Sequence, residues 1–131
     1  LRPIIRQLKD WGCRASLFMD PLPEQIALIH SLGAERIELY TETYAEAHAR
    51  GDHTRVLYAF QRAAKVASEH HLGINAGHDL NLRNLPDFHV PDLLEVSIGH
   101  AFTIDALRIG IPEAIRHYLQ ALSLRSESIA D

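Results

Sequence analysis

Apolar and polar positions along this chain follow two alternating patterns. Short apolar runs predict strands over 15–19, 37–40, 72–76 and 94–98. Between them, apolar residues recur at helical spacing, which predicts helices over 3–11, 21–32, 55–70 and 112–124 and a short helix after Gly99. Strands that alternate with helices in this way form parallel βαβ units. The chain is therefore expected to be an α/β protein.

Turn residues and polarity predict what lies between these elements. Asp20-Pro21 is expected to cap the helix that follows it. The polar segment 41–54 is expected to be a loop that contains a helical turn over 45–48. The segment 79–91 is expected to be a loop or a short helix, because two prolines interrupt it.

Four βα units fit two architectures. They make half of a (β/α)8 barrel, or they make a small doubly wound sheet. The sequence contains neither a Gly-x-Gly-x-x-Gly motif nor a Walker-type phosphate loop, which would support the doubly wound sheet. The hydrophobic pattern by itself suits both.

Two of the predicted strands end in a Gly-His dipeptide, Gly77-His78 and Gly99-His100. In a parallel α/β protein the carboxyl ends of the strands lie at one rim, where active sites are built. His78 is a candidate general acid or base, because imidazole titrates near neutral pH. The alternative is a loop histidine that hydrogen-bonds to backbone.

Gly99-His100 also begins a predicted helix, whose free backbone N–H groups favour an anion such as phosphate. Gly99 would let a ligand approach the backbone closely, or it would serve only the turn.

Two carboxylates add to this picture. Glu38 alternates with Ile37 and Leu39, so it shares the opposite strand face with Tyr40. On the inside of a barrel that carboxylate would be paired, hydrogen-bonded or raised in pKa, and on an exposed strand it would be solvated. Asp79 would orient His78 or accept a substrate proton, or it would cap the next segment.

Composition excludes some classes of function. With 131 residues, a formal net charge of -4 and a pI near 6.1, the chain is not expected to bind nucleic acid or anionic membranes. No apolar run approaches the roughly 20 residues of a membrane span. The single cysteine, Cys13, excludes an internal disulfide and fits a reducing cytoplasm.

A zinc site and a cysteine nucleophile are two alternatives to this chemistry. The histidines considered as a zinc set were His70, His71, His78, His89 and His100. No metal is expected, because the sequence has no helical His-Glu-x-x-His and Cys13 has no second cysteine beside it. Cys13 precedes a strand, so it is expected at the rim opposite the candidate site.

Five segments resemble one enzyme family in order and spacing: Ser16-Leu17-Phe18-Met19-Asp20, Ile37-Glu38-Leu39-Tyr40-Thr41, Tyr44-Ala45, Asn75-Ala76-Gly77-His78-Asp79-Leu80 and Ile98-Gly99-His100-Ala101. Together they resemble the pyridoxine 5'-phosphate synthases (PdxJ family). The resemblance runs from about Cys13 to Leu122. It implies that residues 1–131 are the C-terminal half of a single (β/α)8 TIM-barrel domain and supply about its last four βα units.

The resemblance implies an activity in vitamin B6 biosynthesis. The family condenses 1-deoxy-D-xylulose 5-phosphate with 3-amino-2-oxopropyl phosphate and closes a pyridine ring. The products are pyridoxine 5'-phosphate, inorganic phosphate and water. It uses no organic cofactor and assembles into homo-octamers. By motif, His78 resembles the family's proton-donating histidine and Glu38 its charge-stabilising glutamate, while Asp79, Gly99 and His100 fall where the aminoketone phosphate is held.

The sequence also departs from the family pattern. Asp79 stands where some members carry glycine. A backbone contact would survive this change, but a second phosphate close to the carboxylate would be repelled. Tyr40 and Glu42 stand where other members have histidine and glycine. The family's other catalytic histidine and glutamate and its sugar-phosphate arginines lie in the N-terminal half and have no counterpart here. Residues upstream are therefore expected to be missing, and the chain alone is expected to be inactive.

Two alternatives remain beside this enzyme. One is another phosphate-binding barrel enzyme, such as an isomerase or an aldolase. Most such aldolases need a Schiff-base lysine, and the only lysines, Lys9 and Lys65, lie on predicted helices. The other alternative is a non-catalytic half-barrel that binds phosphates or assembles with a partner.

Overall fold

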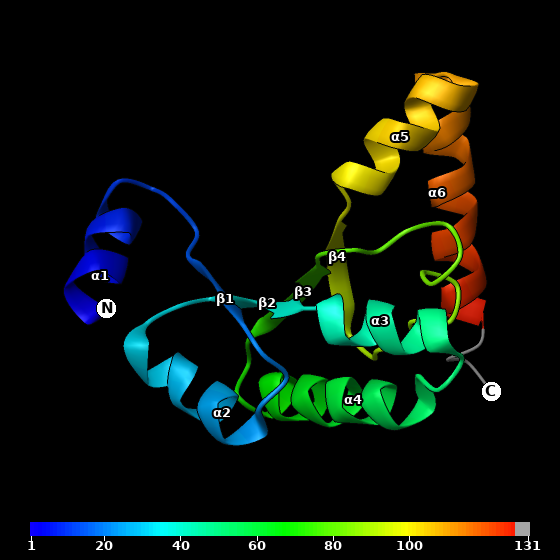
Figure 1. The fold of residues 1–131 in the computed structure, drawn as a ribbon. Helices are drawn as coiled ribbons and strands as arrows, with labels where there is room; N and C mark the ends of the chain where they lie inside the picture. Colours follow the sequence, from blue (N-terminus) through cyan, green and yellow to red (C-terminus); the bar gives the residue numbers. More distant parts are fainter. Residues whose placement is uncertain (128–131) are drawn as a thin grey trace.

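A computed structural model describes residues 1–127 and has the expected alternation of strands and helices (Figure 1). The elements in chain order are α1 (Arg2–Asp10), β1 (Ser16–Met19), α2 (Pro23–Leu32), β2 (Arg36–Tyr40), α3 (Glu42–Arg50), α4 (Thr54–Glu69), β3 (Gly73–Gly77), β4 (Leu93–Ser97), α5 (His100–Ile109) and α6 (Ile111–Glu127). None of these helices combines the length and apolarity needed to cross a membrane.

The topology of the sheet separates the two architectures. Its four strands lie in the order β1-β2-β3-β4, and each pairs in parallel with the next strand along the chain. A doubly wound sheet reverses its strand order partway across, whereas a barrel adds parallel strands in chain order. The α/β class is confirmed, and the strand order fits part of a barrel.

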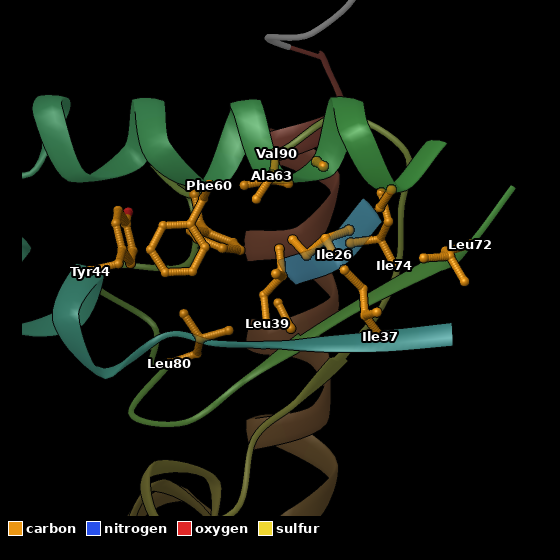
Figure 2. Close-up of a cluster of buried hydrophobic side chains, with 14 of the residues drawn as sticks. Ile26, Ile37, Leu39, Tyr44, Phe60, Ala63, Leu72, Ile74, Leu80 and Val90 are labelled. Atoms are coloured by element: carbon orange, nitrogen blue, oxygen red, sulfur yellow. The ribbon is translucent and has the colours of Figure 1, made fainter. Parts of the chain in front are cut away.

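One face of the sheet carries the hydrophobic core. Ile37 and Leu39 on β2 and Ile74 on β3 are buried, and they point toward α4 (Figure 2). Phe60 and Ala63 on α4 meet them from the other side and have no exposed surface. Burial of a side chain as large as Phe60 stabilises the fold by about 1.5–3 kcal/mol. The alternation of β2 therefore fixes which of its residues face away from the helices.

The described residues leave the other face of the sheet uncovered. Phe18 on β1 and Leu94 on β4 are each 58% exposed. Glu38 and Tyr40 lie on this face and are half-buried. In a closed barrel this face would point to the interior, where side chains from all strands pack in layers. Exposed apolar side chains on this face are therefore expected if the described residues form half of such an interior.

The same open face has a charged cluster near the start of the strands. Arg36 donates a hydrogen bond to Asn75 over 3.1 Å and forms an ion pair with Glu95. Arg14 lies 3.5 Å from the same carboxylate. The cluster joins β2, β3 and β4 from the side opposite the core, and it lies at the far end of the strands from the Gly-His dipeptides.

Two local predictions were wrong. The segment 41–54 is not a loop with one helical turn, because α3 runs from Glu42 to Arg50 and ends at Gly51, which has a φ of 78°. Burial of Tyr44 and Ala47 stabilises this helix. Asp20-Pro21 does not cap α2, which begins at Pro23 after Leu22 and has no side-chain cap.

The remaining boundaries agree with the structure within a few residues. Of the two forms considered for the segment 79–91, the structure has turns and no helix. The helix after Gly99 is α5, and the final helix, α6, is longer than expected.

Candidate active site

A hollow with a volume of about 650 Å³ opens near the carboxyl ends of the strands. It lies between β1, β2 and β4, the loop after β3, and the beginnings of α3 and α5. Its lining residues are Phe18, Glu38, Ala45, Glu46, His78, Asp79, Leu80, Asn81, Ser97, Gly99, His100 and Ala101. The structure thus brings together all five residues that the sequence singled out: Glu38, His78, Asp79, Gly99 and His100.

Glu38 faces the hollow from the middle of β2. It is in register with Phe18 on β1 and Asn75 on β3. Its Oε1 atom lies 2.6 Å from the position that a Cβ atom on Gly77 would occupy. Among residues 1–124, whose side chains the structure describes, no hydrogen-bond donor or cation pairs with its carboxylate, so both oxygens are available to a ligand.

His78 has an unusual backbone conformation. Its φ is 99°, and Asp79 follows with a φ of 56°. Residues other than glycine rarely adopt a positive φ. The hydroxyl of the fully buried Thr41 donates a hydrogen bond to the His78 carbonyl. The Thr41 N–H donates to the carbonyl of Gly77 over 3.0 Å. These two bonds hold the turn that directs His78 into the hollow.

Buried polar groups also fix the backbone of Asp79. The Asn84 side-chain amide donates to the Asp79 carbonyl over 3.0 Å, and Asn84 is only 2% exposed. The Tyr44 hydroxyl donates to the carbonyl of Asn84 over 2.7 Å. A buried hydrogen-bond chain of this kind is costly to break. The loop after β3 is therefore tied to α3, and the Asp79 side chain lies 3.8 Å from the His78 ring at its Nε2 atom.

Tyr40 lies beside the His78 ring. The two ring centroids are 4.6 Å apart, with an angle of 51° between the planes. The Tyr40 hydroxyl donates to Glu42 Oε2 over 2.7 Å. This hydrogen bond, with smaller contributions from desolvation and from the charges of Glu42, Asp79 and Asp20, raises the pKa of Tyr40 to about 12. Tyr40 is therefore a neutral hydrogen-bond donor at physiological pH.

Gly99 forms the N-cap of α5 without any requirement of the fold for glycine. Its φ of −107° is open to other residues, and a Cβ atom there would meet no atom within 4 Å. The described residues do not require a glycine at this turn, which favours a role for Gly99 in the close approach of a ligand. Open space in front of the first N–H groups of a ten-residue helix is suited to an anion.

The histidine set considered for zinc is not assembled. Only His78 and His100 of that set line the hollow. In the part of the chain that the structure describes, two other groups of three place their ligand atoms within 4.8 Å of one another. One is Glu42 with His78 and Asp79, and the other is His48 with His53 and Asp87. In the first group the Glu42 carboxylate already accepts the Tyr40 hydrogen bond.

Sequence reasoning missed the residues that support the site. Thr41 and Asn84 act through hydrogen bonds to the backbone of His78 and Asp79, and no periodic pattern marks such contacts. Phe18 lines the hollow. Strict alternation with Leu17 and Met19 along β1 would have placed it on the Glu38 face.

The chemical capacity of this arrangement follows from its parts. An imidazole and an unpaired carboxylate face one hollow, and a helix N-terminus opens beside them. Such a site can hold an anionic substrate, move protons and stabilise positive charge that develops on the substrate.

Comparison with known proteins reduces the number of reactions that this arrangement could serve. The sequence profile of "Pyridoxal phosphate biosynthesis protein PdxJ" matches residues 1–124. Pyridoxine 5'-phosphate synthase from Xanthomonas campestris pv. campestris (strain B100) is 50% identical over 125 residues, which are 94% of this chain and 49% of that protein.

Two further relatives carry the same name. The synthase from Xylella fastidiosa (strain 9a5c) is 48% identical over 93% of this chain and 48% of its own length. The synthase from Albidiferax ferrireducens is 46% identical over 94% and 50%. The chain spans about half the length of the curated relatives it matches, as expected for part of a TIM barrel.

Proposed function

The chain belongs to the PdxJ family of pyridoxal phosphate biosynthesis proteins, and on that basis we propose that it supplies the C-terminal half of a pyridoxine 5'-phosphate synthase active site. The proposed reaction condenses 1-deoxy-D-xylulose 5-phosphate with 3-amino-2-oxopropyl phosphate. The products are pyridoxine 5'-phosphate, inorganic phosphate and water. One observation carries the proposal: Glu38 on β2 and His78, directly after the adjacent strand β3, face the same hollow beside the open N-terminus of α5.

His78 is the proposed proton donor and acceptor. Closing a pyridine ring requires repeated proton transfers, dehydrations and the loss of a phosphate. An imidazole side chain can serve both as acid and as base in such steps. The hydrogen bonds from Thr41 and Asn84 hold the backbone carbonyls of His78 and Asp79, so the loop that carries the imidazole is fixed.

Glu38 is the proposed stabiliser of positive charge. An amine that condenses with a ketone passes through iminium-like states, and a fixed carboxylate stabilises them without reorganising. The support for this role is that the Glu38 carboxylate has no competing partner among the described side chains of residues 1–124 and that Gly77 leaves room for it. Proton transfer and charge stabilisation would thus come from neighbouring strands.

The aminoketone phosphate is proposed to bind at Gly99 and His100. The first N–H groups of α5 would donate to its oxygens, and the helix dipole would add to the attraction. Asp79 would contribute a backbone contact, because its carboxylate repels a phosphate. The sugar phosphate would be held mainly by the other half of the barrel.

The aldolase alternative loses support from the positions of the lysines. Lys9 lies on α1, 3.6 Å from Glu35, and Lys65 is exposed on α4. Neither lines the hollow, so neither is placed to form a Schiff base there. The proposal also includes a homo-octamer, as the family resemblance implies, and a cytoplasmic location, which the single cysteine fits.

The direct test uses the protein at its complete natural length. Both phosphorylated substrates are supplied together, and pyridoxine 5'-phosphate and released phosphate are measured. We expect the two products in equal amounts and no product when either substrate is omitted. Phosphate release without the pyridine product would contradict the proposal and would favour a different phosphate-binding barrel enzyme.

A further inference from the structure

Two half-buried histidines and one carboxylate meet on a part of the molecule that the proposed reaction does not use. His48, His53 and Asp87 place one potential ligand atom each within 4.8 Å of one another. None of the three lines the hollow that contains Glu38 and His78. From this geometry we propose that His48, His53 and Asp87 form a second site, which binds a divalent transition-metal ion such as Zn²⁺.

The local fold holds the two histidines together. His48 lies in the last turn of α3, and His53 is the N-cap of α4 (Figure 1). Between them, Gly51 takes a φ of 78° and closes the turn with a 3.0 Å hydrogen bond from its N–H to the His48 carbonyl. The ring centroids of His48 and His53 are 4.7 Å apart. The turn therefore brings the two rings to one place before any ion is added.

Asp87 is brought to the same place by the core. Its neighbour Phe88 is fully buried, and the Phe88 ring lies 4.7 Å from the Tyr44 ring and 5.4 Å from the Phe60 ring. This anchored residue fixes the loop, and Asp87 Oδ2 lies 2.8 Å from His48 Nε2. The carboxylate itself is 53% exposed, which gives an ion a path from solvent.

The hydrogen bonding of the protein does not account for the position of His53. Its Nδ1 atom is buried and has no hydrogen-bond partner within residues 1–124, the part of the chain whose side chains are described. A polar atom buried in this way costs free energy, and such an atom calls for an explanation. A role as a metal ligand would explain why a histidine, and not an apolar residue, stands at this position.

The ligand set indicates the class of ion. Two imidazoles and one carboxylate are typical ligands of zinc, and Mg²⁺ and Ca²⁺ prefer sites made of oxygen ligands. Bonds of about 2.0–2.1 Å at tetrahedral angles place ligand atoms roughly 3.3 Å apart. The three atoms here reach that spacing by shifts of an ångström or so, and a water molecule would complete the coordination.

Such an ion would clip the loop before β4 to the turn between α3 and α4. The same loop begins at His78 and Asp79, and Asn84 within it already bonds to both Asp79 and Tyr44. The proposed metal ion would therefore stabilise the loop that supports the hollow, and it would not contact a substrate.

The test is a zinc titration of the complete protein after treatment with a chelator and its removal, followed by calorimetry. Asp87→Asn is the main variant, because the side chain is exposed and its loss leaves the core intact. His53→Gln is the second variant. His71→Gln is the matched control, since His71 is an exposed histidine outside both candidate clusters. We expect each of the first two substitutions to weaken zinc binding at least tenfold and the control to leave it unchanged.

A second measurement keeps the outcome decisive. Zinc is expected to raise the thermal midpoint of the parent protein and of His71→Gln, and to leave that of Asp87→Asn where it was, because a ligand stabilises only the state that binds it. The proposal is overturned if the parent protein binds no zinc. It is equally overturned if Asp87→Asn titrates like the parent while Glu42→Gln abolishes binding, which would place the ion at Glu42, His78 and Asp79.

Discussion

The Glu38 carboxylate occupies the space in which a side chain on Gly77 would stand. Its Oε1 atom lies 2.6 Å from the position that a Cβ atom on Gly77 would occupy. The Cβ atom of Ser97, on β4, lies 2.8 Å from the same position. Real Cβ atoms do not approach other atoms so closely. Glu38 can therefore hold its carboxylate in this position only because Gly77 on β3 has no side chain.

Gly77→Ala is therefore expected to move Glu38. The added methyl group overpacks the site, which costs about 1–3 kcal/mol of stability. A displacement of about an ångström in a catalytic group lowers the rate by roughly 100-fold. Circular dichroism and steady-state kinetics of the complete protein check both effects. Parent-like turnover of the folded variant would mean that the placement of Glu38 does not limit the reaction.

Glu38→Gln tests the charge alone. Glutamine keeps the shape of glutamate and removes the negative charge, so charge stabilisation is lost while the hollow is preserved. We expect a fall of about 10²–10³ in kcat and little change in binding of the aminoketone phosphate. An unchanged kcat would show that Glu38 is only a structural part of the hollow.

His78→Asn removes the proposed acid and base. Asparagine accepts positive φ more readily than most residues, so the turn at 99° is kept. Loss of an essential proton-transfer group is expected to lower the rate by roughly 10²–10⁴. His71→Asn is the matched control, because His71 is exposed, has a φ of 56° and lies outside the hollow. Turnover of His78→Asn within tenfold of the control would remove His78 from the mechanism.

Gly99→Val probes the proposed phosphate site without disturbing the fold. The backbone there has a φ of −107°, and a Cβ atom meets nothing within 4 Å, so thermal stability is expected to hold. The valine side chain would block close approach to the first N–H groups of α5. Loss of one or two charge-assisted hydrogen bonds weakens binding of the aminoketone phosphate by about 1–3 kcal/mol. Gly99→Ala is expected to give a smaller loss, and equal affinities for all three proteins would place the phosphate elsewhere.

Tyr40 gives a prediction about alkaline pH. Its pKa is raised from 10.0 to about 12, chiefly by the hydrogen bond to Glu42. Because the pKa is higher in the folded state, folding favours the protonated tyrosine. This contribution to the free energy of unfolding is present below pH 10 and is lost as the pH rises through about 12. Glu42→Gln is expected to return the pKa of Tyr40, followed by its phenolate absorbance, toward the ordinary value. Asp79→Asn is expected to shift this pKa less. Superimposable titrations of the parent and Glu42→Gln would rule out this cause.

Local periodicity was enough to predict the strands and helices and which of their faces are buried. Apolar periodicity separates strands from helices, and alternation along β2 puts Glu38 and Tyr40 opposite Ile37 and Leu39. Strand ends in a parallel sheet meet at one rim, so the two Gly-His dipeptides were placed together from their order alone. These features follow from steps of two and 3.6 residues, which any short segment carries within itself.

The tertiary structure alone decided how the site is supported. The close approach of Glu38 to Gly77 depends on the register of β2 against β3, and the hydrogen bonds from Thr41 and Asn84 depend on how the loop folds back. The meeting of His48, His53 and Asp87 depends on where Phe88 packs. Such contacts join residues that are distant in sequence, and their distances come from the packing of the whole core. A local pattern therefore cannot encode them.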